Sequence, residues 1–141
     1  MKELILNKEL YIKSSTKKGS ELKTLSELSK IKTGDVVTAR IIIKADRSMD
    51  YVHLKVMRAS GLEPIQQLSG YQYKNGLGYY ISPRDLATDF FISYLPKGTY
   101  VLEYDMRASF KGTFSDGIST LQCMYAPEFS AHSKGIRIII E

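Results

Sequence analysis

The stretch that decides the fold is residues 95–128, LPKGTYVLEYDMRASFKGTFSDGISTLQCMYAPE. From Tyr100 onward, apolar residues alternate with charged ones. The first set is Tyr100, Leu102, Tyr104, Met106 and Ala108, and the second is Glu103, Asp105 and Arg107. A period of two is typical of a strand with one buried face and one solvated face. We therefore predict a core hairpin in this stretch, with the set that begins at Tyr100 pointing inward.

The length and composition are those of one globular domain. The chain has 141 residues, of which 43% are hydrophobic and 25% are charged. These are ordinary values, and the length is sufficient for one real core but short for two. We expect a single β-sandwich domain over residues 1–141, with an extended N-terminal arm and loop over 1–33 and a core sandwich over 34–141.

The net charge is +5, and much of the excess comes from lysines in the first 32 residues. These lysines alternate with serines and glutamates, without an aromatic platform or a glycine-rich phosphate loop. They therefore predict a solvated surface and no nucleic-acid partner. No apolar run is long enough to cross a membrane, so we expect no membrane insertion. No signal peptide is recognisable at Met1, but a fragment of a larger protein would lack one in any compartment.

Strand patterns recur about every ten residues, with turn residues between them. The clearest runs are Val36–Ala45, Tyr51–Arg58, Thr88–Leu95 and Ile136–Ile140. Asn75-Gly76 predicts a hairpin, since both residues tolerate the positive φ of primed turns. Apolar residues between Leu22 and Ile31 recur every three positions, which allows a short helix, although an extended segment fits nearly as well. The predicted fold class is all-β, an antiparallel β-sandwich with at most one short helix.

Patterns for catalysis or metal binding are weak. Cys123 is the one cysteine, and strand alternation places it as a small core side chain. His53 and His132 lie on separate predicted elements, which makes a poor metal site and gives a thiol no assembled base. The motifs S-x-x-K at 14–17 and K-T-G at 32–34 nearly abut, in a chain too short for the enzymes that use them. We expect no enzyme activity, no catalytic residue, no metal and no cofactor.

Four tyrosines flank the predicted hairpin, namely Tyr71, Tyr73, Tyr79 and Tyr80. Tyrosines on a hairpin usually pack as cross-strand pairs. If they are exposed, they would instead form an adhesive or carbohydrate-stacking surface, or a docking patch for another domain. The charged set around Glu103 is predicted to be a solvated sheet face, with an interface as the alternative.

Several short motifs occur in a fixed order along the chain. They are Gly61–Pro64, Gly76–Tyr80, Leu95–Tyr100, Tyr104, Arg107, Gly112–Phe114 and Met124–Phe129, the last of which reads M-Y-A-P-E-F. As a set they resemble the C-terminal, receptor-binding-like domain of bacterial alpha-2-macroglobulin family proteins, especially the forms found in Bacteroides-like bacteria. The resemblance covers most of the chain. One departure is Val56–Glu63, where family members often carry an acidic residue and two prolines, so no role of that acid is carried over.

The resemblance implies a macroglobulin-type, immunoglobulin-like sandwich at the end of a larger, lipid-anchored protein of the periplasm or cell surface. In the family, upstream domains carry a protease bait region and often a thioester. The last domain is non-catalytic, packs against the thioester-bearing region and helps to hold the native state. The expected partners are thus other domains of the same parent chain, and target proteases are met only through the parent.

The residues that we expect at this inter-domain contact are Tyr79, Tyr80, Met124, Tyr125, Pro127 and Glu128. The alternative is an adhesive or carbohydrate-binding β-sandwich module of a bacterial surface protein, in which the tyrosines would stack on sugar.

Overall fold

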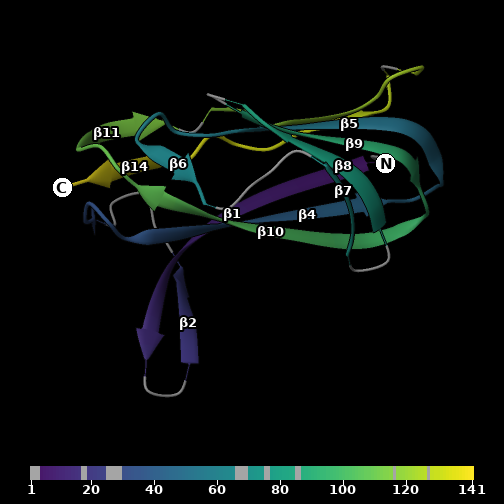
Figure 1. The fold of residues 1–141 in the computed structure, drawn as a ribbon. Coiled ribbons are helices and arrows are strands. Elements are labelled where there is room, and N and C mark those ends of the chain that lie inside the picture. Colours follow the sequence, from purple (N-terminus) through teal and green to yellow (C-terminus); the bar gives the residue numbers. More distant parts are fainter. Residues whose placement is uncertain are drawn as a thin grey trace.

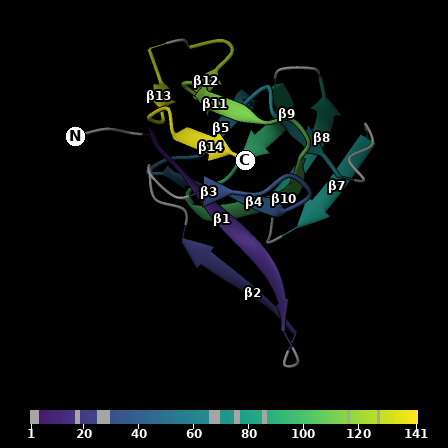
Figure 2. The same ribbon diagram turned by 90° about the vertical axis from the view of Figure 1, so that its left-hand side faces the viewer.

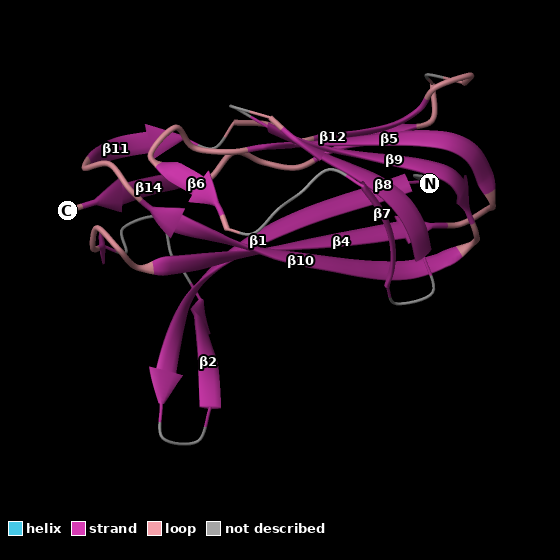
Figure 3. Ribbon diagram, in the orientation of Figure 1, coloured by secondary structure: helices cyan, strands magenta, loops and turns pink. Residues whose placement is uncertain are grey.

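The computed structural model describes residues 4–16, 19–24, 30–65, 70–74, 77–84, 87–115, 117–126 and 128–141. Within these ranges the chain forms strands and loops and no helix (Figure 3). The strands are β1 (Leu4–Thr16), β2 (Gly19–Thr24), β3 (Lys30–Ile31), β4 (Val36–Ala45), β5 (Met49–Met57), β6 (Leu62–Pro64), β7 (Gly70–Lys74), β8 (Leu77–Pro83), β9 (Ala87–Leu95), β10 (Gly98–Ala108), β11 (Gly112–Ser115), β12 (Thr120–Cys123), β13 (Ser130–His132) and β14 (Arg137–Ile140).

Two large antiparallel sheets face each other (Figure 1). The five-stranded sheet has the order β2-β1-β4-β10-β6, and the six-stranded sheet has the order β13-β12-β5-β9-β8-β7. A small sheet, β11-β14-β3, lies across the end of the sandwich that faces the viewer in Figure 2. Strand β2 and the far half of β1 project away from the body. The predicted fold class, an antiparallel β-sandwich, is confirmed.

The core lies between the two large sheets because their strands alternate in burial. On β4 the inward side chains are Val37, Ala39, Ile41, Ile43 and Ala45, and on β5 they are Val52, Leu54 and Val56. The rings of Phe90 on β9 and Tyr104 on β10 lie 6.1 Å apart, which joins the two layers across the interior. Each fully buried side chain of this kind contributes roughly 1.5–3 kcal/mol relative to an exposed one.

The stretch 95–128 supplies the predicted inward face but not the predicted hairpin. On β10, Tyr100, Leu102, Tyr104, Met106 and Ala108 are all buried. However, β10 pairs with β4 and β6, whereas β9 lies in the opposite sheet and β11 pairs with β14. The turn at Pro96–Lys97 therefore carries the chain from one layer to the other. Alternation determines which side of a strand is buried, and it does not determine which strand lies beside it.

The first segment forms a full strand of the sandwich. β1 pairs with β4 from Leu4↔Ala45 to Lys13↔Val36, and Leu4, Leu6 and Leu10 are buried. The first part of the predicted arm, for which one or two short strands also fitted the pattern, is thus a strand of the five-stranded sheet. Of the region predicted as a short helix, the described residues lie in β2 and β3, and residues 25–29 lie outside the described ranges. The boundary of the domain stays a prediction.

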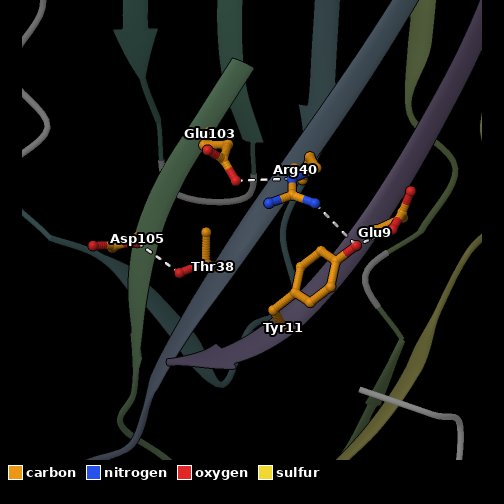
Figure 4. A network of polar contacts seen from close by, with 6 residues as sticks. All are labelled: Glu9, Tyr11, Thr38, Arg40, Glu103 and Asp105. Carbon is orange, nitrogen blue, oxygen red and sulfur yellow. Dashed lines mark hydrogen bonds and ion pairs between the residues drawn. The ribbon is translucent and has the colours of Figure 1, made fainter. Parts of the chain in front are cut away.

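The outer face of the five-stranded sheet carries a network of charges (Figure 4). Arg40 Nε donates to Glu103 Oε2 over 2.8 Å, which raises the pKa of Arg40 above its ordinary value. Arg40 also lies over the Tyr11 ring, 4.7 Å from its centroid. The Tyr11 hydroxyl donates to the Glu9 carboxylate, which raises the pKa of Tyr11.

A neighbouring carboxylate on this face is paired as well. Asp105 accepts from Thr38 Oγ1 at 2.8 Å and from Lys13 Nζ at 3.0 Å. Two of the charges predicted for a solvated face, Glu103 and Asp105, therefore have partners on neighbouring strands of this face.

Gly61 controls how closely the small sheet approaches β6. A Cβ atom added at Gly61 would lie 2.5 Å from Phe114 Cε2 and 2.9 Å from Ile140 Cδ1. Its carbonyl also accepts from the Ser109 N–H at 2.9 Å, which holds the backbone in place. The position therefore has no room for a side chain.

We predict that Gly61→Ala destabilises the chain by about 1–3 kcal/mol, because an added methyl group overpacks a well-filled contact. Gly78→Ala is the matched control, since its Cβ would meet Tyr73 at an ordinary 3.5 Å. Urea unfolding of both variants measures the difference. If Gly61→Ala were as stable as the unsubstituted chain, the close contact between Gly61 and Phe114 would be contradicted.

Candidate interaction surface

The outer face of the six-stranded sheet carries a row of rings. The registers Tyr71↔Tyr80, Tyr80↔Phe91 and His53↔Phe91 place one ring on each of the strands β7, β8, β9 and β5. Ring centroids are 5.0 Å apart for Tyr71–Tyr80, 6.5 Å for Tyr80–Phe91 and 4.8 Å for the stacked pair His53–Phe91. We call these four residues the aromatic row. It runs across the strands because directly opposed residues share a face.

Most of the exposed large hydrophobic side chains of the described residues belong to this sheet or to the turn after β12. They are Tyr51, Tyr71, Tyr73, Phe91, Tyr94, Met124 and Tyr125, whereas Ile5, Phe110 and Ile118 lie elsewhere. Scattered exposed apolar residues need no explanation, but a cluster on one face marks a surface for contact. This face is therefore the candidate interaction surface.

A hollow of about 600 Å³ adjoins the aromatic row. It is lined by Tyr71, Gln72, Tyr73, Gly78, Tyr79, Tyr80, Phe91, Ser93, Tyr94 and Pro96. The strands β8 and β9 are in register from Tyr80↔Phe91 to Pro83↔Thr88, so Leu77–Tyr79 extends past the paired region, where the hollow lies. We call this hollow the tyrosine groove.

The turn after β12, residues 123–129, is held by backbone hydrogen bonds. Cys123 N–H donates to Phe129 O at 3.0 Å, and Phe129 N–H donates to Ala126 O at 2.9 Å. Met124 N–H donates to Tyr51 O at 2.9 Å, which ties the turn to β5. Tyr125 is nonetheless 78% exposed. The turn thus presents apolar side chains on a defined backbone.

Tyr51 supports this turn from the neighbouring strand. It has a φ of 55°, a left-handed conformation that costs energy for a residue with a Cβ atom. Its ring packs edge-on against Tyr125, with 5.3 Å between centroids. The residue with the strained backbone, Tyr51, is therefore also the residue whose ring packs against the exposed Tyr125 ring.

The structure separates the residues predicted at the contact into three groups. Met124, Tyr125 and Glu128 are exposed on the 123–129 turn. Tyr80 is half-buried in the aromatic row, and the strands β5 and β9 lie between it and the turn. Tyr79 is only 7% exposed, and Pro127 lies outside the described residues.

Tyr79 points inward because it alternates with Tyr80 along β8. Its ring centroid lies 5.5 Å from that of Phe90, and its hydroxyl donates to Gln72 Oε1 at 3.4 Å. Burial raises the pKa of Tyr79 above the ordinary value of 10.0. Tyr79 is therefore mainly a core side chain that reaches one wall of the groove.

Sequence reasoning missed three residues of this surface, namely Tyr51, Phe91 and Tyr94. Tyr51 alternates with the buried Val52, and Phe91 lies between the buried Phe90 and Ile92. The period of two could have placed both on the outer face. Nothing in the local pattern predicts Tyr94, which has the parity of the buried set and is exposed.

The residues considered for catalysis do not form one site, because Cys123 and His53 lie on the paired strands β12 and β5 but on opposite faces of the sheet. Cys123 Sγ donates to Asp50 O at 3.5 Å and is buried, as predicted for a core side chain. His53 Nε2 lies 2.9 Å from Asp89 Oδ1, and Arg84 Nε lies 3.0 Å from Asp89 Oδ2. Within the described ranges, no three His, Cys, Asp or Glu side chains gather as metal ligands. No helix of that part of the chain is long and apolar enough to span a membrane.

The facing antiparallel sheets define a β-sandwich domain of the macroglobulin type. Comparison with family models identifies the particular family. The chain belongs to the bacterial alpha-2-macroglobulin MG10 domain family, whose model matches residues 4–128. The matched range includes every residue predicted at the contact. A comparison with curated proteins finds no match.

Solved structures of longer bacterial proteins share the fold. The chain is similar to Salmonella alpha-2-macroglobulin reacted with methylamine, with a TM-score of 0.74, 18% identity, and coverage of 98% of this chain and 9% of that one. It is also similar to native Escherichia coli alpha-2-macroglobulin from domain MG7 to the C-terminus, with a TM-score of 0.77, 18% identity, and coverage of 99% and 23%. A non-cellulosomal cohesin from Archaeoglobus fulgidus matches with a TM-score of 0.51, 9% identity, and coverage of 94% and 91%. At these identities the likeness is one of fold.

Burial of Tyr79 predicts a specific loss of stability at alkaline pH. Because its folded pKa is raised, stability is fully present below the ordinary pKa and falls as pH rises above about 10. We expect the free energy of unfolding of Tyr79→Phe to match that of the unsubstituted chain within about 1 kcal/mol at pH 8. Between pH 8 and pH 11, Tyr79→Phe should lose less stability than the unsubstituted chain. Denaturant unfolding at both pH values measures this. The exposed Tyr73→Phe is the control, and an identical pH dependence in all three proteins would contradict the burial.

Proposed function

We propose that this chain is the C-terminal, receptor-binding-like domain of a larger bacterial alpha-2-macroglobulin protein, of the Bacteroides type. It spans 9% of the Salmonella chain that it resembles and 23% of the E. coli fragment that ends at the C-terminus. Both proportions fit one domain among many. In this role the chain is non-catalytic and supplies contacts to the rest of its parent.

The observation that carries the proposal is the 123–129 turn. Met124 and Tyr125 are large, exposed and apolar, and the backbone that presents them is held by hydrogen bonds to Phe129 and Tyr51. A preorganised aromatic anchor loses little conformational freedom on binding, and such anchors dominate interface energies. We infer that Met124, Tyr125, Pro127 and Glu128 dock on a sister domain, with Tyr80 at the margin.

The proposed sister domains are those of the upstream, thioester-bearing region, and the contact would stabilise the native state of the parent. The parent would act as a protease inhibitor and meet its target proteases through other domains. We place it outside the cytoplasm, in the periplasm or at the cell surface, with a lipid anchor elsewhere in the parent. The domain needs no cofactor in this role.

The alternative is an adhesive or carbohydrate-binding module. Its sequence-based form placed the hairpin tyrosines on the sugar, and of these Tyr79 is a core residue whereas Tyr71 and Tyr73 are exposed. The tyrosine groove is the specific observation that favours carbohydrate binding. Its most exposed rings are those of Tyr71 and Tyr73.

The proposed contact predicts an effect that depends on the parent. Truncating a buried interface aromatic costs about 2 kcal/mol or more, so Tyr125→Ala should lower the first calorimetric unfolding transition of the intact parent. In the 141-residue chain alone, Tyr125 is exposed and the same change should alter stability by less than about 0.5 kcal/mol.

Phe110→Ala is the matched control, because Phe110 is an exposed aromatic on another part of the chain and should affect neither protein. An unchanged parent transition in Tyr125→Ala would refute the contact. Equal losses in the parent and in the isolated chain would make Tyr125 a residue of the fold.

A further inference from the structure

The tyrosine groove differs in its chemistry from the rest of the surface. One quarter of the chain is charged, yet none of the described side chains that line the groove is Lys, Arg, Asp, Glu or His. Its polar atoms are phenol hydroxyls, the Gln72 amide and the Ser93 hydroxyl. The described lining thus offers no group to neutralise a charge, so it complements an uncharged ligand.

The aromatic side chains stand out from the sheet at the groove. Tyr71 is 87% exposed and Tyr73 is 76% exposed, while the half-buried Tyr80 and the less exposed Phe91 also line the groove. The exposed tyrosines bury little apolar area in the fold, so their positions contribute little to its stability. Their ring faces are available to a ligand, and each face carries the negative side of the ring quadrupole.

A ligand for this groove must combine a flat apolar face with many neutral hydrogen-bonding groups. A pyranose ring with equatorial hydroxyls has both, since its axial C–H groups form a weakly positive face and its hydroxyls surround the edge. The C–H face would lie on Tyr71 or Tyr73, and the hydroxyls would reach Ser93 and the phenol hydroxyls of the lining. The volume of about 600 Å³ is within the usual range of roughly 300–1,000 Å³ for ligand sites.

The charge of the groove and of the chain also disfavours two other classes of ligand, namely anionic sugars and organic cations. A phosphorylated or acidic sugar needs Arg or Lys, which the described lining lacks. A quaternary ammonium group binds aromatic cages, but the chain carries a net charge of +5 and repels cations. An uncharged ligand avoids both costs.

We propose that the tyrosine groove binds a neutral oligosaccharide of pyranose units with equatorial hydroxyls, with Tyr71 and Tyr73 as stacking residues. This activity goes beyond the inter-domain contact and does not depend on it. The groove lies on β7, β8 and β9, whereas the 123–129 turn follows β12, which is separated from β9 by β5. Apart from Tyr80, which lines the groove and lies at the margin of the proposed contact, the two activities use different residues.

The test is a titration of the ¹⁵N-labelled 141-residue chain with cellohexaose and, separately, with fully N-acetylated chitohexaose, followed by two-dimensional NMR. We expect saturable shifts at the groove with at least one of them. Tyr71→Ala and Tyr73→Ala should each weaken binding about fivefold or more, because each removes a stacked ring. Tyr73→Phe keeps the ring and should weaken binding less than Tyr73→Ala.

Tyr125→Ala is the matched control, since Tyr125 is as exposed as Tyr73 but lies outside the groove. It should leave the affinity unchanged. The spectra of the alanine variants also report whether each remains folded, which we expect for such exposed positions.

Three results would overturn the proposal. The first is the absence of groove shifts with both hexasaccharides at millimolar concentration. The second is an equal loss of affinity in Tyr125→Ala and Tyr73→Ala. The third is a decaproline peptide that shifts the groove while neither sugar does, which would make the groove a peptide site. None of these results bears on the effect of Tyr125→Ala on the unfolding of the intact parent.

Discussion

The packing of the two large sheets against each other is the constraint on which the structure depends. Each central strand gives alternate side chains to one shared core, and the contact between Phe90 and Tyr104 joins the layers. Because alternate side chains of each strand point into this interior, the remaining side chains point outward and form the two outer faces. The fold thus separates stability from surface chemistry by the period of two.

The two outer faces have opposite characters. On the five-stranded sheet, Arg40, Glu103 and Asp105 take part in cross-strand pairs that are satisfied within the chain (Figure 4). On the six-stranded sheet the corresponding positions carry rings, several of them largely exposed. A charged face whose side chains are paired within the chain is stable in contact with water, whereas an exposed aromatic face favours contact with another molecule. For this reason both proposed activities are placed on the six-stranded sheet.

Much of the fold was predictable from short-range patterns. The strands around Val36–Ala45 and Thr88–Leu95, the hairpin of β7 and β8 and the burial of Cys123 follow from alternation and turn chemistry. The candidate surface was only partly predictable. Two adjacent tyrosines on β8 differ in burial, because Tyr79 points into the core and Tyr80 points out. A cluster of like residues does not by itself tell which members a strand exposes.

The sequence alone determined the fold class, the inward face of most strands and, through the order of its motifs, the family. These depend on local properties, namely side-chain periodicity and turn preferences. Only the tertiary structure decided that stretch 95–128 crosses between sheets, that Tyr51 adopts a positive φ beneath Tyr125, and that Tyr71, Tyr80, Phe91 and His53 form one row. Each of these depends on which strands become neighbours and in what register. Long-range pairing sets that choice, and no local pattern contains it.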